Sequence, residues 1–533
     1  MTAAAADIIV RNATLIDGTG SPARRCELLI KDGRVAAMVS PADMPGADLR
    51  ASHEIDAAGL LVTPGFIDIH SHSDYTLLVD PRALSQISQG VTLEVIGNCG
   101  WGCQPISNVA LSQEIIYGFD KSVDLSWRTT DDYLNRLAES KPAVNVATLV
   151  PNGQLRMATV GVADRPATTD EQSRMSTLLA EGLEAGAFGY STGLEYATER
   201  NASEAEVAEL CRVCAKSGGL YATHTRNRDE AAVEAIAEAI RTARVGNVRL
   251  QISHLTPRRG RDDLEKSMDL VDAARREGQD VSFDMHTRLF GTVALKVLLP
   301  QWAFEGGKAA LAARLKDPSV RQRMKSHRNL ISSLADWDRV VLLECKSRPE
   351  FSRRSLGDIA AQSGEEPLDV AYDLLLAEIE HIESRPMVIL LSYSEELLSR
   401  TYQHPHCMVG SDATALCPDG PLAQATFHGS YTWASWFYRR MARETGTFTA
   451  EEAIHKITGM PAAVLGLKDR GVIRAGAWAD LAIFDPKTFG ETGTTFEPNQ
   501  LAIGMKHVIV NGEIGMRDGR ITGKRTGQVL RRA

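Results

Sequence analysis

Two histidines separated by one residue offer the clearest chemistry in this sequence. They close the stretch from Pro64 to His72, in which a Pro-Gly turn leads into a short apolar strand. Side chains alternate along a strand, so His70 and His72 point to the same side. Two imidazoles that converge at the end of a strand can bind one divalent metal ion. The alternative is a solvated loop that happens to contain two histidines, and the rest of the chain decides between the two.

Four more residues of ligand type each follow an apolar segment predicted as a strand. They are Cys99, His224, His254 and Asp412, which come after the segments 91–96, 220–223, 248–252 and 408–410. Any one of them alone can be a hydrogen-bonded core residue. Together with His70 and His72 they place six ligand-type side chains at five strand ends, enough for one or two zinc ions. The pattern therefore favours a metal site.

The segments that position these side chains alternate between strand and helix. Strands are predicted at 66–70, 91–96, 144–150, 187–191, 220–223, 248–252, 280–283 and 408–410, with helices such as 170–184 and 229–245 between them. Eight such units indicate an α/β protein built on a parallel (β/α)₈ TIM barrel, predicted to span residues 63–466. Chemistry in such a barrel takes place at the C-terminal ends of the strands, where the six side chains fall.

Both ends of the chain read as short strands and turns. Strands are expected at 8–10, 13–16, 27–30, 34–38, 481–484 and 508–510, and we predict that residues 1–62 and 467–533 form one small β-sandwich domain. The stretch 287–400 lies between the seventh and eighth barrel strands. Most of it has a helical pattern, which indicates an inserted lid or subdomain.

Composition narrows the class of protein. The chain has 533 residues and a formal net charge of −9, which argues against nucleic acid as a partner. No apolar run reaches the length of a membrane span and no signal peptide is recognisable, so we expect a cytoplasmic protein. Eight scattered cysteines fit a reducing compartment. Cys211 and Cys214 share one face of a predicted helix, which favours core packing over a redox pair.

These residues make the chain resemble the amidohydrolase superfamily, and within it the N-acyl-D-amino-acid deacylase (D-aminoacylase) branch. The resemblance covers nearly the whole chain, from about residue 7 to residue 531. Its motifs include Gly97-Asn98-Cys99-Gly100, Gly189–Tyr196, Thr223-His224-Thr225-Arg226-Asn227, Ser253-His254-Leu255 and Gly410-Ser411-Asp412. The Gly-Asn-Cys-Gly element is specific to this branch, because most relatives bridge their metals with a carbamylated lysine.

The resemblance implies a set of roles for the metal ligands. Cys99, His224 and His254 would hold one zinc ion tightly. His70, His72 and Asp412 would form a second and weaker position, and the Cys99 thiolate could bridge the two as a ligand rather than a nucleophile. The reaction implied is hydrolysis of a linear amide C–N bond by metal-activated water, with Asp412 as general base and then general acid.

Several positions depart from the family pattern, and they concern the substrate. His286 stands where the family has a tyrosine, and it can donate a hydrogen bond to the oxyanion or merely support the site. Thr256 replaces a lysine and Trp433 replaces an arginine, although a fixed cation is what a substrate carboxylate calls for. The predicted metal ligands therefore match the family pattern, but the predicted substrate-binding residues differ from it.

Two alternatives for substrate recognition stay open. Trp433 and its aromatic neighbours either line the site for a neutral or aromatic amide or form a helix face packed against the barrel. Alternatively, arginines at other positions of the chain can supply the cation that a substrate carboxylate needs. The candidate cations are Arg226, Arg258, Arg259 and Arg288, and Tyr196 matches an active-site tyrosine of the family. We expect Tyr196, Arg226, Thr256, Arg288 and Trp433 at the substrate site.

The expected partner is a small-molecule amide, and the sequence leaves a homo-oligomer open. A hydrolase of cyclic amides, carbamates or ureides, or a deaminase of the same superfamily, is the first alternative. A non-catalytic amidohydrolase-like scaffold is a further alternative from a different class. It ranks last because all six ligand positions are filled.

Overall fold

The computed structural model describes residues 6–40 and 50–532, apart from 110–111, 114–115, 117–119, 121, 162, 197, 305, 328–335, 344 and 382–386. The chain divides into two compact units. The first comprises Met1–Pro257, Arg261–Thr287 and Ser399–Ala533, and the second Arg258–Gly260 and Arg288–Leu398. The boundaries predicted from the sequence for the domains stay predictions.

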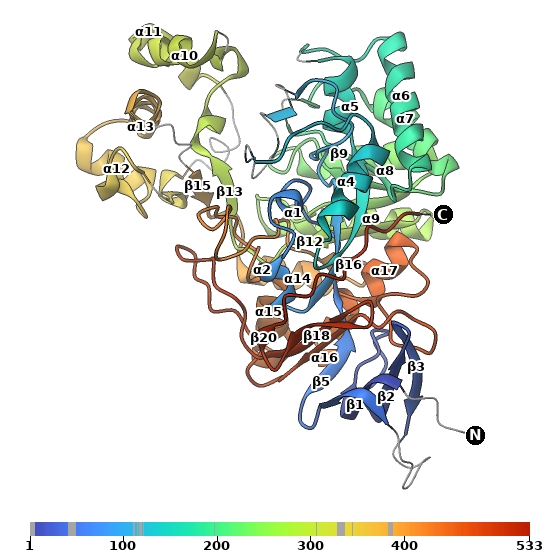
Figure 1. Cartoon of the computed structure of the whole chain (residues 1–533). Helices are drawn as coiled ribbons and strands as arrows, with labels where there is room; N and C mark the ends of the chain where they lie inside the picture. Colours follow the sequence, from blue (N-terminus) through green and yellow to red (C-terminus); the bar gives the residue numbers. More distant parts are fainter. Residues whose placement is uncertain are drawn as a thin grey trace. The chain divides into compact units, whose positions relative to one another are not determined.

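An eight-stranded parallel sheet forms the barrel of the first unit, and the strands neighbour one another in chain order (Figure 1). The strands are β6 (Phe66–Asp68), β7 (Val91–Ile96), β8 (Asn145–Pro151), β9 (Gly189–Gly193), β10 (Leu220–His224), β11 (Arg249–Ile252), β12 (Val281–Met285) and β16 (Cys407–Val409). This arrangement confirms the predicted fold class. The first strand is shorter than predicted, because it ends at Asp68 rather than His70.

The two end strands of the barrel sheet meet beyond their last residues. Ser71 and Ala413 form an isolated parallel bridge. The Asp412 N–H donates to the His70 carbonyl at 2.8 Å, and the His72 N–H donates to the Ala413 carbonyl at 2.7 Å. The segments that carry three of the predicted ligands therefore also close the barrel.

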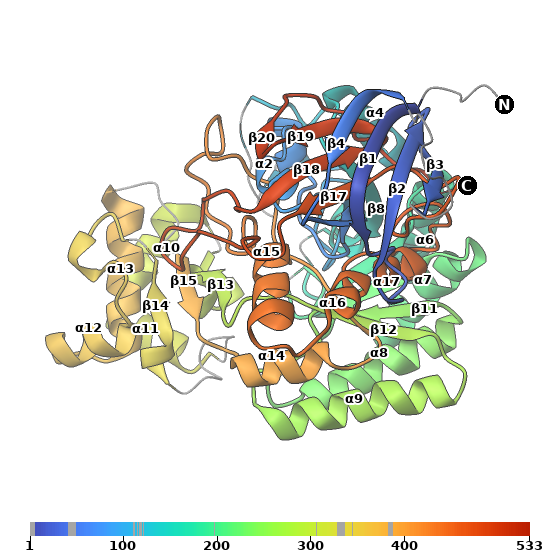
Figure 2. The same ribbon diagram turned by 90° about the horizontal axis from the view of Figure 1, so that it is seen from below.

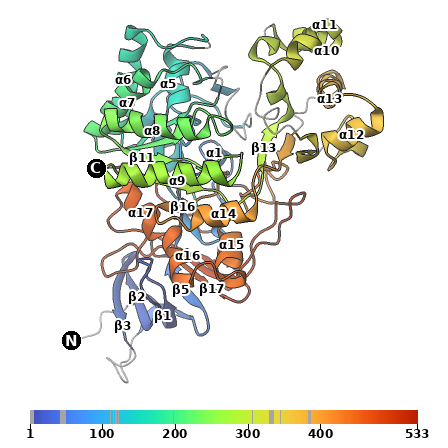
Figure 3. The same cartoon turned by 180° about the vertical axis from the view of Figure 1, so that it is seen from behind.

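Polar side chains cap the start of some of the helices between the strands, and apolar stripes face inward. At the start of α6 the Thr168 side chain and the Glu171 carboxylate cap each other's backbone N–H. Met175, Leu179 and Leu183 recur every four residues on its buried side. The crossover helices are α1 (Thr76–Val79), α2 (Leu84–Ile87), α4 (Thr130–Ser140), α5 (Asn152–Thr159), α6 (Thr169–Glu184), α7 (Glu204–Lys216), α8 (Ala232–Gly246) and α9 (Arg261–Arg276). Figure 3 shows α6 to α9 side by side.

Further helices of this unit flank β16 in the chain, the first before it and the others after it. They are α14 (Glu395–Tyr402), which begins in the second unit, α15 (Trp433–Phe437), the π-helix η6 (Tyr438–Glu444), α16 (Ala450–Lys456) and α17 (Gly459–Leu465). Within the described part of the chain, no helix has the length and apolar character needed to cross a membrane.

Strands from both ends of the chain lie in one sheet (Figure 2). It has nine strands, and the pairing of β5 with β17 joins its two halves. Its strands are β1 (Ala6–Leu15), β2 (Arg24–Lys31), β3 (Arg34–Val39), β4 (Ala51–Asp56), β5 (Leu61–Pro64), β17 (Leu481–Phe484), β18 (Met505–Val510), β19 (Glu513–Arg517) and β20 (Arg520–Ile521). The two strands expected at 8–10 and 13–16 are one strand. A bulge between Val10 and Ala13 interrupts its ladder, with Asn12 in the left-handed region at φ 57°.

The second unit contains a small sheet besides the helices predicted for it. The three antiparallel strands are β13 (Gly291–Ala294), β14 (Val340–Leu342) and β15 (Met387–Leu390), in the order β13-β15-β14. The helices are α10 (Gly307–Lys316), α11 (Pro318–Lys325), α12 (Leu356–Ser363) and α13 (Pro367–His381), with short 3₁₀ turns η1 (Leu295–Leu298), η2 (Gln301–Phe304), η4 (Trp337–Arg339) and η5 (Pro349–Phe351). A buried apolar cluster of its own holds this unit together.

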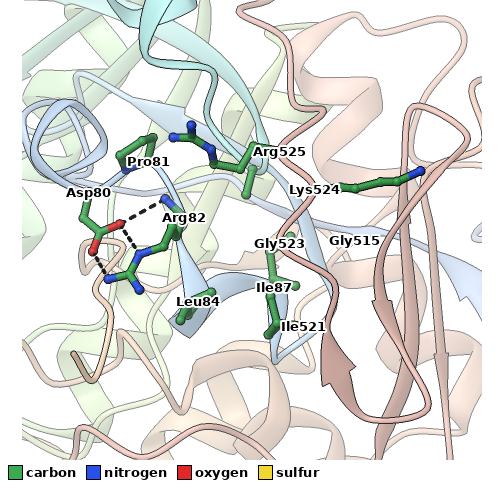
Figure 4. Close-up of a pocket in the computed structure, with 11 residues that line it drawn as sticks. Asp80, Pro81, Arg82, Leu84, Ile87, Gly515, Ile521, Gly523, Lys524 and Arg525 are labelled. Atoms are coloured by element: carbon green, nitrogen blue, oxygen red, sulfur yellow. Dashed lines mark hydrogen bonds and ion pairs between the residues drawn. The ribbon is translucent and has the colours of Figure 1, made fainter. Parts of the chain in front are cut away.

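The C-terminal segment returns to the N-terminal end of the barrel strands. The Val146 N–H donates to the Gln528 carbonyl at 2.9 Å, and the Leu530 N–H donates to the Val146 carbonyl at 2.7 Å. Leu530 packs against the apolar core of the barrel. Slightly upstream, Arg525 lines a cavity of about 410 Å³ together with the Asp80–Arg82 ion pair (Figure 4). None of the predicted metal ligands lines this cavity.

Removing residues 526–533 tests this return of the chain. We expect the free energy of unfolding to fall by about 3 kcal/mol, because several backbone hydrogen bonds of about 1 kcal/mol each disappear. Thermal unfolding measures the change. The matched control removes only residues 532–533 and keeps both bonds to Val146. Zinc content should stay the same in both, since the segment lies at the end of the strands opposite the predicted ligands. An unchanged melting temperature in the longer truncation would contradict the prediction.

Candidate metal centre

The six side chains predicted as metal ligands come together at the C-terminal ends of the barrel strands. They form three overlapping groups in which the ligand atoms lie within 4.8 Å of one another. The groups are His70–His72–Cys99, Cys99–His224–His254 and His70–His254–Asp412. Because each group shares members with the next, the six residues make one continuous cluster.

Short distances run through the centre of this cluster. The Cys99 sulfur lies 3.1 Å from His70 Nε2 and 3.6 Å from His254 Nε2. Asp412 Oδ1 lies 3.2 Å from His72 Nε2 and 3.5 Å from His70 Nε2. Nitrogen, sulfur and carboxylate oxygen are the donor atoms that zinc takes in proteins, so the donor set fits one or two zinc ions.

Three members of the cluster have a backbone conformation that L-residues rarely adopt. The φ angles are 53° at Cys99, 35° at His254 and 45° at Asp412. Such left-handed conformations are unfavourable for a residue with a Cβ atom and persist only where the surroundings impose them. They turn each side chain sharply at the end of its strand, and here all three turn into one cluster.

Close packing holds the loop of Cys99. The Ser191 hydroxyl donates to the Gly97 carbonyl and accepts from the Gly100 N–H at 3.1 Å. The Gly153 N–H donates to the Gly100 carbonyl at 3.0 Å. A Cβ atom on Gly100 would lie 1.8 Å from Glu199 Oε1, so this position has no room for a side chain. The glycines beside Cys99 are thus required by space as well as by the turn.

Alternation sends the residues around His70 in two directions. The hydroxyls of Ser71 and Ser73 both donate to Glu94 Oε1 at 2.7 Å. Glu94 is fully buried, and burial raises its pKa to about 8. His70 and His72 point the other way, as the sequence predicted. The serines therefore anchor the segment, while the histidines face the cluster.

Carboxylates orient two of the cluster histidines through the ring nitrogen remote from the other ligands. Asp284 Oδ1 lies 2.9 Å from His70 Nδ1, and Glu195 Oε2 lies 2.8 Å from His224 Nε2. A histidine that ligates a metal commonly donates its other N–H to such a partner, which fixes the ring and its tautomer. This leaves Nε2 of His70 and Nδ1 of His224 for a metal ion.

The electrostatic field of the cluster suits a cation. Burial by itself raises the pKa of the Cys99 thiol, but His70 and His254 lower that pKa well below its usual value. Burial acts to lower the pKa of His72, but Asp412 and Cys99 raise it to about 9. A site that stabilises thiolate and positive charge together also stabilises a divalent ion. Burial, Arg228 and His224 lower the pKa of His254 to about 4, which keeps its imidazole neutral as a ligand must be.

Comparison with known proteins agrees with this geometry. A family model described as "Amidohydrolase family" matches residues 53–515. The chain is 34% identical over 531 residues to N-acyl-D-aspartate deacylase of Alcaligenes xylosoxydans xylosoxydans, covering 99% of this chain and 95% of that protein. It is 32% identical over 530 residues to D-aminoacylase of the same organism, covering 99% and 98%. The chain belongs to the amidohydrolase family.

A solved relative has the same fold. The crystal structure of N-acyl-D-glutamate deacylase from Bordetella bronchiseptica, complexed with zinc and a phosphonate that mimics the tetrahedral intermediate, has a TM-score of 0.79 at 30% identity. The match covers 99% of this chain and 100% of that one. The resemblance to the D-aminoacylase branch is therefore confirmed.

Two further residues predicted for the site of this amidohydrolase lie beside the cluster. The Tyr196 hydroxyl is 3.2 Å from His224 Nδ1, and the Tyr196 ring meets that of Trp101 edge to face at 5.1 Å between centroids. His286 Nε2 lies 4.0 Å from Asp412 Oδ2. Both residues can thus reach a group bound at the ligands.

The remaining predicted substrate residues are placed differently. Arg226 pairs with Glu238 at 2.7 Å and donates to backbone carbonyls. Thr256 is fully buried, with its hydroxyl 2.8 Å from that of Thr401. Trp433 is fully buried and donates to Gln86 at 3.2 Å. These contacts favour packing inside the fold for Trp433. Arg288, like Arg258 and Arg259, belongs to the second unit, and its role stays a prediction.

Sequence reasoning did not single out the residues that support the ligands. Asp284 and Glu195 each stand at the end of a barrel strand or just beyond it, so the rule that identified the ligands could have identified them too. Glu94 and Arg228 gave no such signal. Glu94 reads as one residue of a buried strand, and Arg228 reads as one more charged residue of a loop.

Replacing Asp284 with asparagine tests how much the amidohydrolase depends on this carboxylate. Asp284→Asn keeps the shape but places an NH₂ group against the Gln251 donor and removes the charge that faces His70. We expect metal affinity to fall about 10- to 100-fold, the range for partners of metal-binding histidines. Competition with a chelator measures it. The control is Asp272→Asn, since Asp272 also contacts a histidine, His404, at 3.1 Å but away from the cluster. Equal zinc affinity in both variants would refute the assignment.

Proposed function

We propose that this amidohydrolase is a zinc-dependent enzyme that hydrolyses the amide bond of N-acyl-D-amino acids. The observation that carries the proposal is the continuous cluster of Cys99, four histidines and Asp412 at the mouth of the barrel. The relatives supply the substrate class, because they are named D-aminoacylase and N-acyl-D-aspartate deacylase. Zinc accompanies the inhibitor in the solved relative.

Cys99, His224 and His254 would hold one zinc ion, and His70, His72 and Asp412 would form a second position. Zinc supplies a lowered pKa for a water molecule and polarisation of the substrate carbonyl. The residues of the chain must provide the remaining steps, which are proton transfer, stabilisation of the oxyanion and binding of the substrate.

Asp412 is the proton carrier in this proposal. His70 and His72 contact its Oδ1, at 3.5 Å and 3.2 Å, which leaves Oδ2 toward His286. Of the candidate ligands Asp412 is also among the more exposed, with 18% of its side chain accessible, so the substrate can reach it. It takes a proton from the attacking water and delivers that proton to the leaving nitrogen.

Tyr196 and His286 provide hydrogen-bond donors for the substrate oxygen. The Tyr196 hydroxyl lies at His224 Nδ1, beside the proposed zinc position. His286 approaches from the side of Asp412 at 4.0 Å, which is beyond hydrogen-bond length. Donors on two sides of the reacting carbon would stabilise the charge that develops on the oxygen.

A neutral or aromatic amide is the second candidate substrate. Thr256 stands where the family has a lysine, and the Thr256 hydroxyl contacts Thr401 rather than supplying a charge. Trp433 stands where the family has an arginine and is buried. A site without those two cations suits a substrate without a carboxylate.

We further propose a cytoplasmic enzyme that assembles as a homo-oligomer. All eight cysteines are unpaired and buried, which supports a reducing compartment. We expect the oligomer because barrel proteins with an added β domain often form oligomers.

Replacing Asp412 with asparagine tests the proton carrier. We expect kcat to fall by about 10³-fold, within the range for a missing general acid–base. The zinc on Cys99, His224 and His254 should remain, so metal analysis distinguishes a catalytic defect from loss of the site. The control is Asp419→Asn, because Asp419 is exposed and pairs with Arg82. Asp412→Asn with more than a tenth of the wild-type kcat would exclude this role.

A hydrolysis screen tests the substrate. Zinc-loaded enzyme is offered N-acetyl-D-amino acids, their L-enantiomers and the N-acetyl amines that lack the carboxylate, with Asp412→Asn as the blank. We expect turnover of the D-acids, at least tenfold faster than of the L-acids or the neutral amides. Turnover of the neutral amides alone would replace the proposal with the second candidate. Turnover of none of them would overturn both.

A further inference from the structure

The backbone of His254 is held from both sides by charged groups. Its φ of 35° is left-handed, a conformation that needs support. Its N–H donates to Asp284 Oδ1 at 2.9 Å, and its carbonyl accepts from Arg228 Nη2 at 2.7 Å. Both are charge-assisted hydrogen bonds, which are stronger than bonds between neutral groups.

Arg228 spans the turn that follows β11. Its Nη2 also approaches the Thr256 carbonyl at 3.4 Å, so one nitrogen lies over two carbonyls that are two residues apart. Arg228 comes from the segment after β10 and is 7% exposed. Burying a guanidinium is costly unless its hydrogen bonds replace the water it loses. Here the buried guanidinium donates to the backbone carbonyl of His254, a predicted metal ligand.

The direction of the His254 ring depends on this turn. The ring meets the His224 ring edge to face at 4.5 Å between centroids, and its Nε2 lies 3.6 Å from the Cys99 sulfur. A relaxed φ at residue 254 would rotate the Cα–Cβ bond and carry Nε2 away from Cys99. Among the described residues, Asp284 accepts from the N–H of His254 and Arg228 donates to its carbonyl, so the carbonyl side depends on Arg228.

We propose that Arg228 is a positioning residue that clamps the left-handed turn of His254 and thereby sets the affinity of the site for zinc. The inference rests on the proposed function insofar as it takes Cys99, His224 and His254 as zinc ligands. It adds a residue outside the ligand set, and it makes zinc affinity rather than proton transfer the property that Arg228 controls.

The experiment compares Arg228→Met, Arg228→Lys and Arg249→Met with the full-length wild type. Arg249 is the matched control because it begins β11, the strand that leads to His254, and also donates to two carbonyls, those of Val464 and Gly218 at 2.8 Å and 3.1 Å. Zinc affinity is measured by chelator competition. Cobalt substitution reports the thiolate–metal band, and thermal unfolding reports the fold.

We expect Arg228→Met to lower zinc affinity about 10- to 100-fold and to weaken the cobalt–thiolate band. Arg228→Lys keeps the positive charge but lacks the planar guanidinium group with its several N–H donors. Its zinc affinity should therefore fall between those of the wild type and Arg228→Met. Arg249→Met should bind zinc as the wild type does. At saturating zinc, kcat of Arg228→Met should recover most of its loss, because the ligands are intact.

Wild-type zinc affinity in Arg228→Met would overturn the proposal, as would an equal loss in Arg249→Met. If Arg228→Met does not fold, Arg228→Lys decides: affinity equal to that of the wild type excludes the clamp. A wild type that binds zinc but hydrolyses no amide refutes the proposed function and leaves the clamp supported or refuted by affinity alone. A wild type that binds no zinc refutes both.

Discussion

One buried carboxylate holds the metal centre together. Asp284 accepts hydrogen bonds from His70 Nδ1 and the His254 N–H at 2.9 Å, and from Gln251 at 2.6 Å. His70 follows the first barrel strand, Gln251 lies on the sixth with His254 just beyond it, and Asp284 itself lies on the seventh. A single side chain therefore fixes the relative position of three strand ends. A buried charge of this kind is stable only when its hydrogen bonds are complete. Because Asp284 must keep all of these hydrogen bonds, it holds His70 and His254 in fixed positions within the cluster.

The cluster of candidate ligands could be predicted from the sequence because it obeys a simple geometric rule. Strand ends in a parallel barrel meet at one face, and side-chain alternation sends His70 and His72 the same way while Ser71 and Ser73 go to Glu94. The barrel itself was predictable from strands such as β7, which has the predicted bounds. The length of its first strand was overestimated, because His70 pairs through its carbonyl beyond the regular ladder.

Other features had no signal of that kind. The bulge at Asn12 joins two predicted strands into one, since a single left-handed residue lets the ladder continue. Arg228 contacts backbone carbonyls, which have no side-chain identity to match a motif. Trp433 lies in an aromatic run whose burial depends on Gln86, a residue about 350 positions away in the chain. Contacts of this type are decided by tertiary packing and not by local pattern.

Closure of the barrel has a thermodynamic consequence. The seam between the first and last strands consists of the bonds from Asp412 to the His70 carbonyl and from His72 to the Ala413 carbonyl, together with the Ser71–Ala413 bridge. Three residues of the seam are also proposed ligands, so binding a cation and closing the cylinder are linked equilibria. A ligand present at a thousand times its Kd stabilises the state that binds it by about 4 kcal/mol. Zinc would then stabilise the closed barrel as well as serve the reaction, so the folded state would become more stable as the concentration of the ion rises.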